Sequence, residues 1–419
     1  MDSRRNRFVA AAGGALVAAL MLVSWGGAQT PNTCVDCHSV LDAPLKVTQD
    51  QFVQDIHFQK GLTCVSCHGG DPTKTDMDAM SKAAGFRGKT DRKAIPEFCG
   101  KCHSDAALMR QYNPSLRTDQ LSQYQTSVHG RLRAKGDTKV AVCIDCHGVH
   151  NLRPASDTRS SVHPTNVAQT CSRCHADAAY MKGYGIPTDQ FAGYSASVHH
   201  EALAVRGDLS APTCTTCHGN HGAAPPGVAT VQNVCSTCHV FQAQLFEASP
   251  HKAAFAAAGL PGCVTCHSSH RILHPTDDLL GTGSSSICTN CHTSGDAGYQ
   301  VASQIHEQLA KLDTSVKSAE ATVSRAEAAG MEVSQPRLEL DQARDSLTKA
   351  RVSIHGFNNR RIMQDVETGT KIADQTYQAG KSALAERDYR RKGLGVSLLL
   401  IVIVVIGLGL YIRKIERTD

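Results

Sequence analysis

The chain has 419 residues and a formal net charge of +5, with 18 Cys and 21 His but only 5% aromatic residues and one Trp. A chain of this length ordinarily forms two or three domains, yet this composition offers few large apolar side chains to fill their cores. In a secreted protein, the usual interpretation of so many cysteines is a disulfide framework. The spacing of the cysteines excludes that interpretation.

Every cysteine belongs to a Cys-x-x-Cys-His motif, and the motif occurs nine times. The cysteines are Cys34, Cys37, Cys64, Cys67, Cys99, Cys102, Cys143, Cys146, Cys171, Cys174, Cys214, Cys217, Cys235, Cys238, Cys263, Cys266, Cys288 and Cys291. The histidines that close the motifs are His38, His68, His103, His147, His175, His218, His239, His267 and His292. Zinc ribbons and thioredoxin-like sites also use Cys-x-x-Cys, but neither requires a His at the next position each time.

The chemistry of haem attachment explains this spacing. Two thiols add to the two vinyl groups of one porphyrin, and the adjoining imidazole binds the iron from one face as the proximal ligand. The motifs therefore predict nine covalently bound haem c groups, with porphyrin in place of a side-chain core. Without residues 1–28, which hold three Arg and one Asp, the formal charge would be about +3. Two propionates per haem, against roughly one positive charge per oxidised iron–porphyrin, then bring the net charge to about −6, so no nucleic-acid partner is expected.

Haem attachment takes place outside the cytoplasm, so the chain must be exported. Residues 1–28 fit a signal peptide, because three arginines precede an apolar run from Phe8 to Trp25 and small residues precede Gln29. An uncleaved N-terminal anchor is the alternative, since the apolar run is long for a signal.

The motif region contains an internal repeat. The segments Cys99–His150 and Cys171–His221 share the order Cys-x-x-Cys-His, Asp-Ala-Ala, Thr-Asp-Gln, Ser-Val-His and Cys-x-x-Cys-His-Gly-x-His. A shorter copy runs from Cys235 to His270, and Cys34–His68 is a reduced copy that lacks the last His. The repeating unit is thus a pair of haem motifs with two additional histidines.

The additional histidines are candidates for the second axial position of a low-spin haem iron, which takes His or Met. Repeat position selects His57, His129, His199 and His251 between the motifs, and His150, His221 and His270 three residues beyond a proximal His. Three residues of chain do not easily pass around a porphyrin edge, so each of the latter is expected to bind a neighbouring haem.

His306 and His355, on predicted helices, complete nine candidate distal ligands for nine irons. The three remaining histidines, His163, His200 and His274, are expected not to bind iron. Met77, Met80, Met109 and Met181 are alternative ligands, which would raise the haem potential relative to two histidines.

A cysteine-free region with helical periodicity follows the motifs. Its first apolar seam contains Ala302, Ile305, Leu309, Leu312, Val316, Ala319, Val323 and Ala326, and its second contains Leu340, Ala343, Leu347, Ala350 and Ile354. Alternating spacings of three and four residues predict two helices packed along these seams. Gly356 interrupts the second helix, and Asn358 is a plausible cap for a third that begins near Arg360.

The third helix is predicted to enter an uncharged segment, Leu394 to Ile412, that would span about 28 Å and cross a membrane. Arg and Lys flank it on both sides, so export of the haem region, and not the positive-inside rule, orients it. The predicted organisation is a signal peptide (1–28), a nine-haem domain (29–298), a helical hairpin (299–392), a transmembrane helix (393–412) and a cytoplasmic tail (413–419). The expected fold class is mostly α and coil, with very little β.

The nine motifs and the Ser-Val-His and Cys-His-Gly-x-His elements, over about Cys34 to His292, resemble the multihaem cytochrome c families. The resemblance is to cytochrome c3-like proteins and to the tetrahaem quinol dehydrogenases of nitrate and nitrite respiration. Those quinol dehydrogenases usually have four haems and an N-terminal anchor. Nine motifs and a C-terminal anchor depart from that pattern, which argues against direct quinol oxidation.

The sequence therefore predicts an electron-transfer protein of the bacterial inner membrane, with no catalytic residues and its haem domain on the periplasmic side. Its expected partners are the quinone pool or a membrane-embedded redox subunit, and periplasmic or outer-membrane redox proteins. Two alternatives are a quinol dehydrogenase subunit and a terminal reductase of a nitrogen or sulfur oxyanion. The reductase would need one haem iron with an open position.

Overall fold

The computed structural model describes residues 32–223 and 234–417, so the predicted signal peptide lies outside the described residues. Within these ranges the chain consists of helices, turns and coil and contains no strand, which confirms the predicted fold class. The chain divides into two compact units. Among the described residues, the first unit contains 32–188 and 213–223, and the second contains 189–212 and 234–417.

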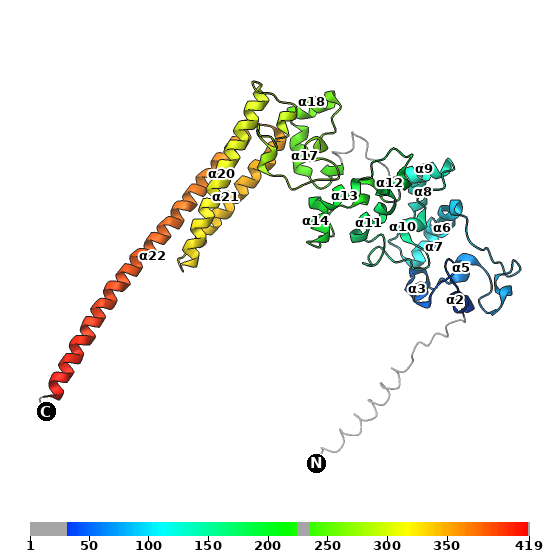
Figure 1. Ribbon diagram of the computed structural model, residues 1–419, viewed down its shortest axis with the longest axis horizontal. Coiled ribbons are helices and arrows are strands. Elements are labelled where there is room, and N and C mark those ends of the chain that lie inside the picture. The colour runs from blue at the N-terminus through cyan, green and yellow to red at the C-terminus, as the bar shows by residue number, and fades with distance from the viewer. Residues whose placement is uncertain (1–31, 224–233, 418–419) are drawn as a thin grey trace, which may run out of the picture. The chain divides into compact units, whose positions relative to one another are not determined.

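The first unit carries six of the nine motifs on short helices (Figure 1). Its elements are α2 (Thr33–His38), α3 (Gln49–Gln54), α4 (Ile56–Gln59), α5 (Cys64–His68), η1 (Met77–Met80), η2 (Arg92–Ala94), α6 (Ile95–His103), α7 (Ala106–Tyr112), α8 (Gln120–Thr126), α9 (Val128–Ala134), α10 (Cys143–His147), α11 (Pro164–His175), α12 (Ala178–Met181) and α15 (Cys214–His218). Its buried apolar side chains, such as Val142 and Val167, are scattered and form no cluster among the described residues. This is the pattern expected where a prosthetic group fills the interior.

The second unit carries the other three motifs and a bundle of long helices. The elements of its motif region are α13 (Gln190–Ser195), α14 (Val198–Ala204), α17 (Val240–Glu247), α18 (Pro250–Ala258), α19 (Cys263–His267), η3 (Asp277–Leu279) and η4 (Cys288–Asn290). The bundle consists of α20 (Ala297–Ala328), α21 (Ser334–Ser353), the short connection η5 (Ile354–Gly356) and α22 (Asn359–Glu416).

The bundle is the antiparallel hairpin and third helix that the periodicity predicts (Figure 1). The core of α20 and α21 is built from the predicted seam residues: Leu309, Leu312 and Ala350 are fully buried. Asn358 caps α22 as expected, because its side chain accepts a hydrogen bond from the backbone N–H of Arg361. Helix α22 packs closely at Gly369, where an added Cβ would lie 2.8 Å from the Cβ of Ser346.

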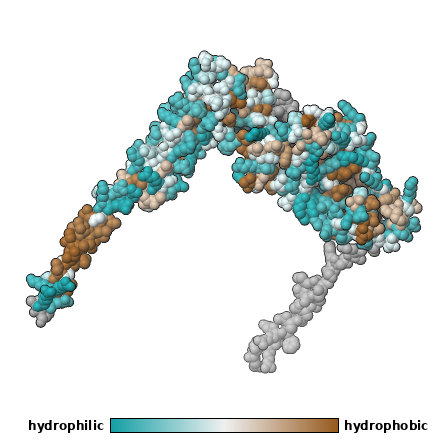
Figure 2. Space-filling model, in the orientation of Figure 1, coloured by the Kyte–Doolittle hydropathy of each residue, from teal (hydrophilic) through white to brown (hydrophobic). Residues whose placement is uncertain are grey.

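The C-terminal part of α22 leaves the bundle and exposes an uncharged and mostly apolar segment, Leu394 to Ile412. Leu399 and Val405, for example, are 62% and 61% exposed. Figure 2 shows this segment as a continuous hydrophobic band on a single helix. Its length and hydropathy make it a candidate membrane span, and none of its 18-residue apolar window is buried by protein.

Candidate haem sites

Seven of the motifs end a helix at the proximal histidine, whereas the ninth begins with the 3-10 turn η4 and the seventh lies just before α17. Helices α5, α10, α15 and α19 coincide with their motifs, and other motifs form the last turn of a longer helix, as in α6 and α11. One helical turn places the two thiols and the following imidazole on neighbouring positions, as attachment to one porphyrin requires.

Left-handed backbone ends four of these turns. The residues after the proximal histidine are Gly69, Gly148, Gly219 and Ser268, with φ of 68°, 77°, 79° and 65°. Glycine adopts this conformation without steric cost, which explains the Cys-His-Gly element of the repeat. In the shorter copy Ser268 replaces this glycine and adopts the same conformation, so the backbone follows the same path there.

Seven proximal histidines of the described residues each face a second imidazole. The pairs are His57–His103, His68–His150, His129–His175, His147–His221, His199–His239, His251–His292 and His267–His355. Their ring centroids are 6.0 to 6.2 Å apart. Two metal–nitrogen bonds of about 2 Å, with roughly 1 Å from each nitrogen to its ring centre, need about this separation. Each pair therefore fits an iron between its two rings.

The pairs connect different copies of the repeat. His57, which precedes the second motif, faces the third motif at His103, and His129 faces the fifth motif at His175. In the opposite direction, His150 faces the second motif at His68, and not His147, which lies three residues away in the sequence. The two full copies, Cys99–His150 and Cys171–His221, thus each contribute one imidazole to a later copy and one to an earlier copy.

Three equivalent backbone hydrogen bonds position these imidazoles. Each runs from the residue before one additional histidine to the residue two positions after another. The bonds are Ile56 N–H to Leu152 O at 2.8 Å, Val128 N–H to Ala223 O at 3.0 Å, and Val198 N–H to Ile272 O at 2.9 Å. The structure therefore repeats where the sequence repeats, and the same bond joins each pair of additional histidine segments.

Side-chain caps fix the short helices that carry the histidines. The buried Ser127 hydroxyl accepts a hydrogen bond from Gly130 N–H at 2.9 Å, and Ser197 accepts one from His200 N–H at 3.2 Å. This is the structural role of serine in the Ser-Val-His element. Asp55 replaces it in the first copy, and its carboxylate also accepts a hydrogen bond from Leu152 N–H at 2.9 Å.

Hydrogen bonds at Nδ1 set the tautomer of several rings. The Nδ1 atoms of His38, His68 and His355 lie 2.8, 3.1 and 2.9 Å from the carbonyl oxygens of Leu45, Gly88 and Val352. A carbonyl only accepts, so Nδ1 carries the proton and Nε2 keeps its lone pair for iron.

Burial favours the neutral form of other rings. Burial, and then the charge of the facing His221, lower the pKa of His147, and burial followed by His355 does the same for His267. A lowered imidazole pKa favours the unprotonated ring, which is the form that binds a metal.

The sulfur atoms show that consecutive motifs are neighbours. First cysteines of consecutive motifs lie close enough to shift each other's thiol pKa, in the pairs Cys34–Cys64, Cys99–Cys143, Cys171–Cys214 and Cys235–Cys263. In the second, fourth and eighth motifs, the second cysteine lies close enough to a cysteine of the next motif for that charge to raise its pKa. These pairs are Cys67–Cys102, Cys146–Cys174 and Cys266–Cys288. Motifs one to six of the first unit, and seven to nine of the second, thus form two uninterrupted series in sequence order.

Comparison with known proteins agrees with this geometry. A family profile described as cytochrome c3 matches residues 56–177. The C-type polyheme cytochrome OmcC of Geobacter sulfurreducens is 28% identical over 186 residues, which cover 42% of this chain and 22% of that protein. No solved structure matches the chain significantly.

The chain is a multihaem c-type cytochrome.

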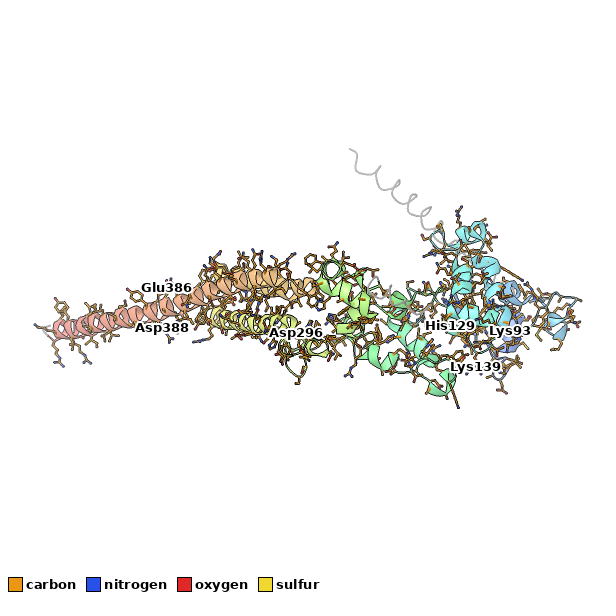
Figure 3. The ribbon with its side chains drawn as sticks, turned by 90° about the horizontal axis from the view of Figure 1, so that it is seen from above. Lys93, His129, Lys139, Asp296, Glu386 and Asp388 are labelled. Carbon is orange, nitrogen blue, oxygen red and sulfur yellow. The ribbon has the colours of Figure 1, made fainter. Side chains whose placement is uncertain are left out.

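Covalently bound haem c fits the residues of this cytochrome, because thiols and facing imidazoles occur together at each pair described above. Two further residues support the haem sites and were not predicted from the sequence. The Asp296 carboxylate, at the start of α20 (Figure 3), lies 3.1 Å from Nδ1 of the proximal His292. The ring of Phe357 lies 3.8 Å from the ring of His251. The spacing His-x-x-x-Asp was the available signal for Asp296, whereas Phe357 had none.

The remaining histidines of the cytochrome have other surroundings. His38 and His306 do not occur in the ring pairs of the described residues, and Nε2 of His306 lies 3.8 Å from Asp278 Oδ1. His163 accepts a hydrogen bond from Thr165 N–H and caps α11, and His200 packs against Tyr194. His218 and His270 each take part in a hydrogen bond, a ring contact or an electrostatic interaction. The assignment of individual distal ligands stays a prediction.

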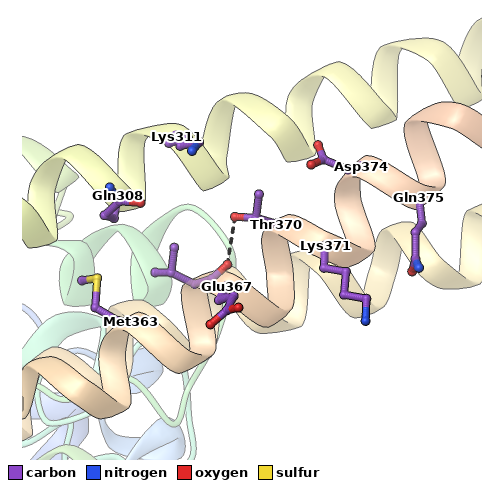
Figure 4. A pocket seen from close by; sticks show the side chains of 9 residues that line it. Gln308, Lys311, Met363, Glu367, Thr370, Lys371, Asp374 and Gln375 are labelled. Atoms are coloured by element: carbon purple, nitrogen blue, oxygen red, sulfur yellow. Dashed lines mark hydrogen bonds between the residues drawn. The ribbon is translucent and has the colours of Figure 1, made fainter.

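The bundle also has a groove, whose lining residues lie outside the motif region of the sequence. It is lined by Gln308 and Lys311 of α20 and by Met363, Val366, Glu367, Thr370, Lys371, Asp374 and Gln375 of α22 (Figure 4). Thr370 donates a hydrogen bond to the carbonyl of Val366 at 2.9 Å, within the helix. The lining contains no His or Cys, so the groove offers neither a thiol for haem attachment nor an imidazole for iron.

Proposed function

We propose that this cytochrome is a membrane-anchored, nine-haem electron conduit of the periplasm. It would carry electrons between the respiratory chain of the inner membrane and periplasmic or outer-surface acceptors. The observation that carries the proposal is the sequence-ordered series of neighbouring motifs in each unit. Neighbouring attachment sites bring successive irons close enough for stepwise electron transfer.

The facing imidazoles support a carrier over a catalyst. An iron with two histidine ligands has no position left for a substrate, and it changes oxidation state with little movement of its ligands. The protein then contributes the spacing of the haems, their axial ligands and their burial, while the redox chemistry belongs to the cofactor.

The membrane anchor is the apolar part of α22. An isolated helix whose exposed side chains are uncharged and mostly apolar is stable in lipid and unfavourable in water. Because haem is attached outside the cytoplasm, the motif region would lie in the periplasm and the residues after Ile412 in the cytoplasm. The electron donor would be the quinone pool or a membrane-embedded redox subunit.

The test is to count haem per chain and to record the electron paramagnetic resonance spectrum of the oxidised, purified protein. Nine haems, all low-spin, are the expected result for a conduit with two axial ligands on each iron. A stoichiometric high-spin signal would contradict it and would favour a reductase with an open iron. The haem at His38 would then be the first to examine, because His38 lies outside the ring pairs of the described residues.

A further inference from the structure

The membrane-distal end of the bundle is part of two haem sites. In the connection between α21 and α22, the ring of His355 lies 6.0 Å from that of His267, with 17° between their planes. Two residues later, Phe357 packs on His251, which faces His292 of the last motif. The motif region and the bundle of the second unit therefore share the haems of the eighth and ninth motifs.

The same connection begins the helix that ends in the membrane. Helix α22 runs without a break from Asn359 to Glu416, and its apolar segment begins at Leu394. These 35 residues, at 1.5 Å per residue, separate the haem end from the apolar segment by about 50 Å. An ordinary helix tilt of about 20° shortens that height only slightly.

The first part of α22 packs closely against the other helices of the bundle. Gly369 lies against Leu312 of α20, and Gly380 lies against Thr322, where an added Cβ would be 3.0 Å from the Thr322 methyl carbon. Ala383 and Leu384 pack against Val323, Ala326 and Val333, near the connection between α20 and α21. Three-helix packing thus continues to within ten residues of Leu394.

The segment between the bundle and the membrane is short and charged. Glu386 and Asp388 lie on it (Figure 3), and three basic residues, Arg390, Arg391 and Lys392, end it. Arg and Lys at this position suit the headgroup region of a bilayer. The bundle therefore spans almost the whole distance between the haem end of α22 and the lipid.

We infer that the bundle is a rigid spacer, and that the haems of the eighth and ninth motifs exchange electrons with a second redox protein and not with quinol in the bilayer. This inference rests on the proposed function. The rate of electron tunnelling falls exponentially with distance. The separation of about 50 Å along α22 is several times the distance that one tunnelling step can cover. The partner is a membrane-bound protein whose haem or iron–sulfur domain rises to the height of these haems.

The transfer step is a single-electron exchange. The reduced one-electron cofactor of the partner loses one electron, and one ferric haem of this cytochrome gains it and becomes ferrous. No bond forms or breaks, and no proton is transferred. The partner oxidises quinol to quinone, releases the two protons and passes on the two electrons one at a time.

The experiment uses the full-length holoprotein in nanodiscs. A long-chain menaquinol confined to the bilayer and a short-chain, water-soluble quinol are compared as reductants by stopped-flow absorbance of the haems. The expected result is reduction by the water-soluble quinol at an initial rate at least 100-fold higher. Comparable rates would overturn the inference, either because α22 bends at Gly393 and Gly395 or because another haem reaches the lipid. A conduit with nine low-spin haems would still stand in that case.

A second measurement reports the height of one haem directly. The variant His355→Ala gives the haem of the eighth motif a high-spin signal of its own, and Ni²⁺ chelated to lipid headgroups speeds the relaxation of nearby spins. Relaxation by a soluble Ni²⁺ chelate but not by the lipid-anchored chelate is expected. Equal relaxation by both chelates would place this haem beside the bilayer and would refute the spacer.

Discussion

The variant His355→Ala tests whether the helical bundle supplies an iron ligand. In the structure His355 faces His267 at 6.0 Å, and its Nδ1 lies 2.9 Å from the carbonyl of Val352, which fixes the ring. Alanine removes the imidazole without disturbing the cysteines that hold the haem. The iron of the eighth motif should then lose one axial bond and become high-spin.

The expected size of the effect follows from the number of motifs. One haem in nine should change, so the high-spin signal should integrate to about one ninth of total haem, and haem per chain should not change. The variant His355→Met should restore a low-spin iron, with a higher potential than the parent because methionine raises the potential relative to histidine. Electron paramagnetic resonance and a spectroelectrochemical titration measure the two quantities.

His306→Ala is the matched control. Both histidines follow an apolar seam residue on a predicted helix, but Nε2 of His306 lies 3.8 Å from Asp278 and not opposite a motif imidazole in the described residues. This control should remain fully low-spin. A high-spin signal from His306→Ala, or an unchanged spectrum from His355→Ala, would refute the pairing.

Three further predictions concern the bundle, the last motif and the anchor. Leu312→Ala, at a fully buried position, should lower the free energy of unfolding of the bundle by about 2–5 kcal/mol, whereas Leu338→Ala, 54% exposed, should change it by less than about 0.5 kcal/mol; denaturation followed by circular dichroism compares them. Asp296→Asn should raise the midpoint potential of one haem, because the carboxylate that strengthens His292 as an electron donor is lost; a lowered potential in a redox titration would contradict this. Removal of residues 393–419 should move the cytochrome from the membrane to the soluble fraction with its haem content unchanged, and a chain that still pelleted with membranes would point to an N-terminal anchor.

The sequence alone determines the features of this protein that depend on neighbouring residues. Cys-x-x-Cys-His predicts haem attachment because both thiols and the proximal imidazole lie within one helical turn. The seam from Ala302 to Ala326 predicts α20, because burial every three or four residues is a property of the helix itself. The uncharged segment after Leu394 predicts a membrane span for the same reason, since length and hydropathy suffice.

Only the tertiary structure decides which imidazoles face each other. The sequence predicts that His150 binds a haem other than that of His147, but it does not say which one; in the folded chain a backbone hydrogen bond joins Ile56 to Leu152 and His150 faces His68. It also treats His306 and His355 alike, since each follows a seam isoleucine. They differ because η5 turns the chain beside α17, next to the eighth motif, whereas His306 lies on α20 beside η3. Contacts between residues distant in the sequence depend on the folded path of the chain, and a local sequence pattern does not determine that path.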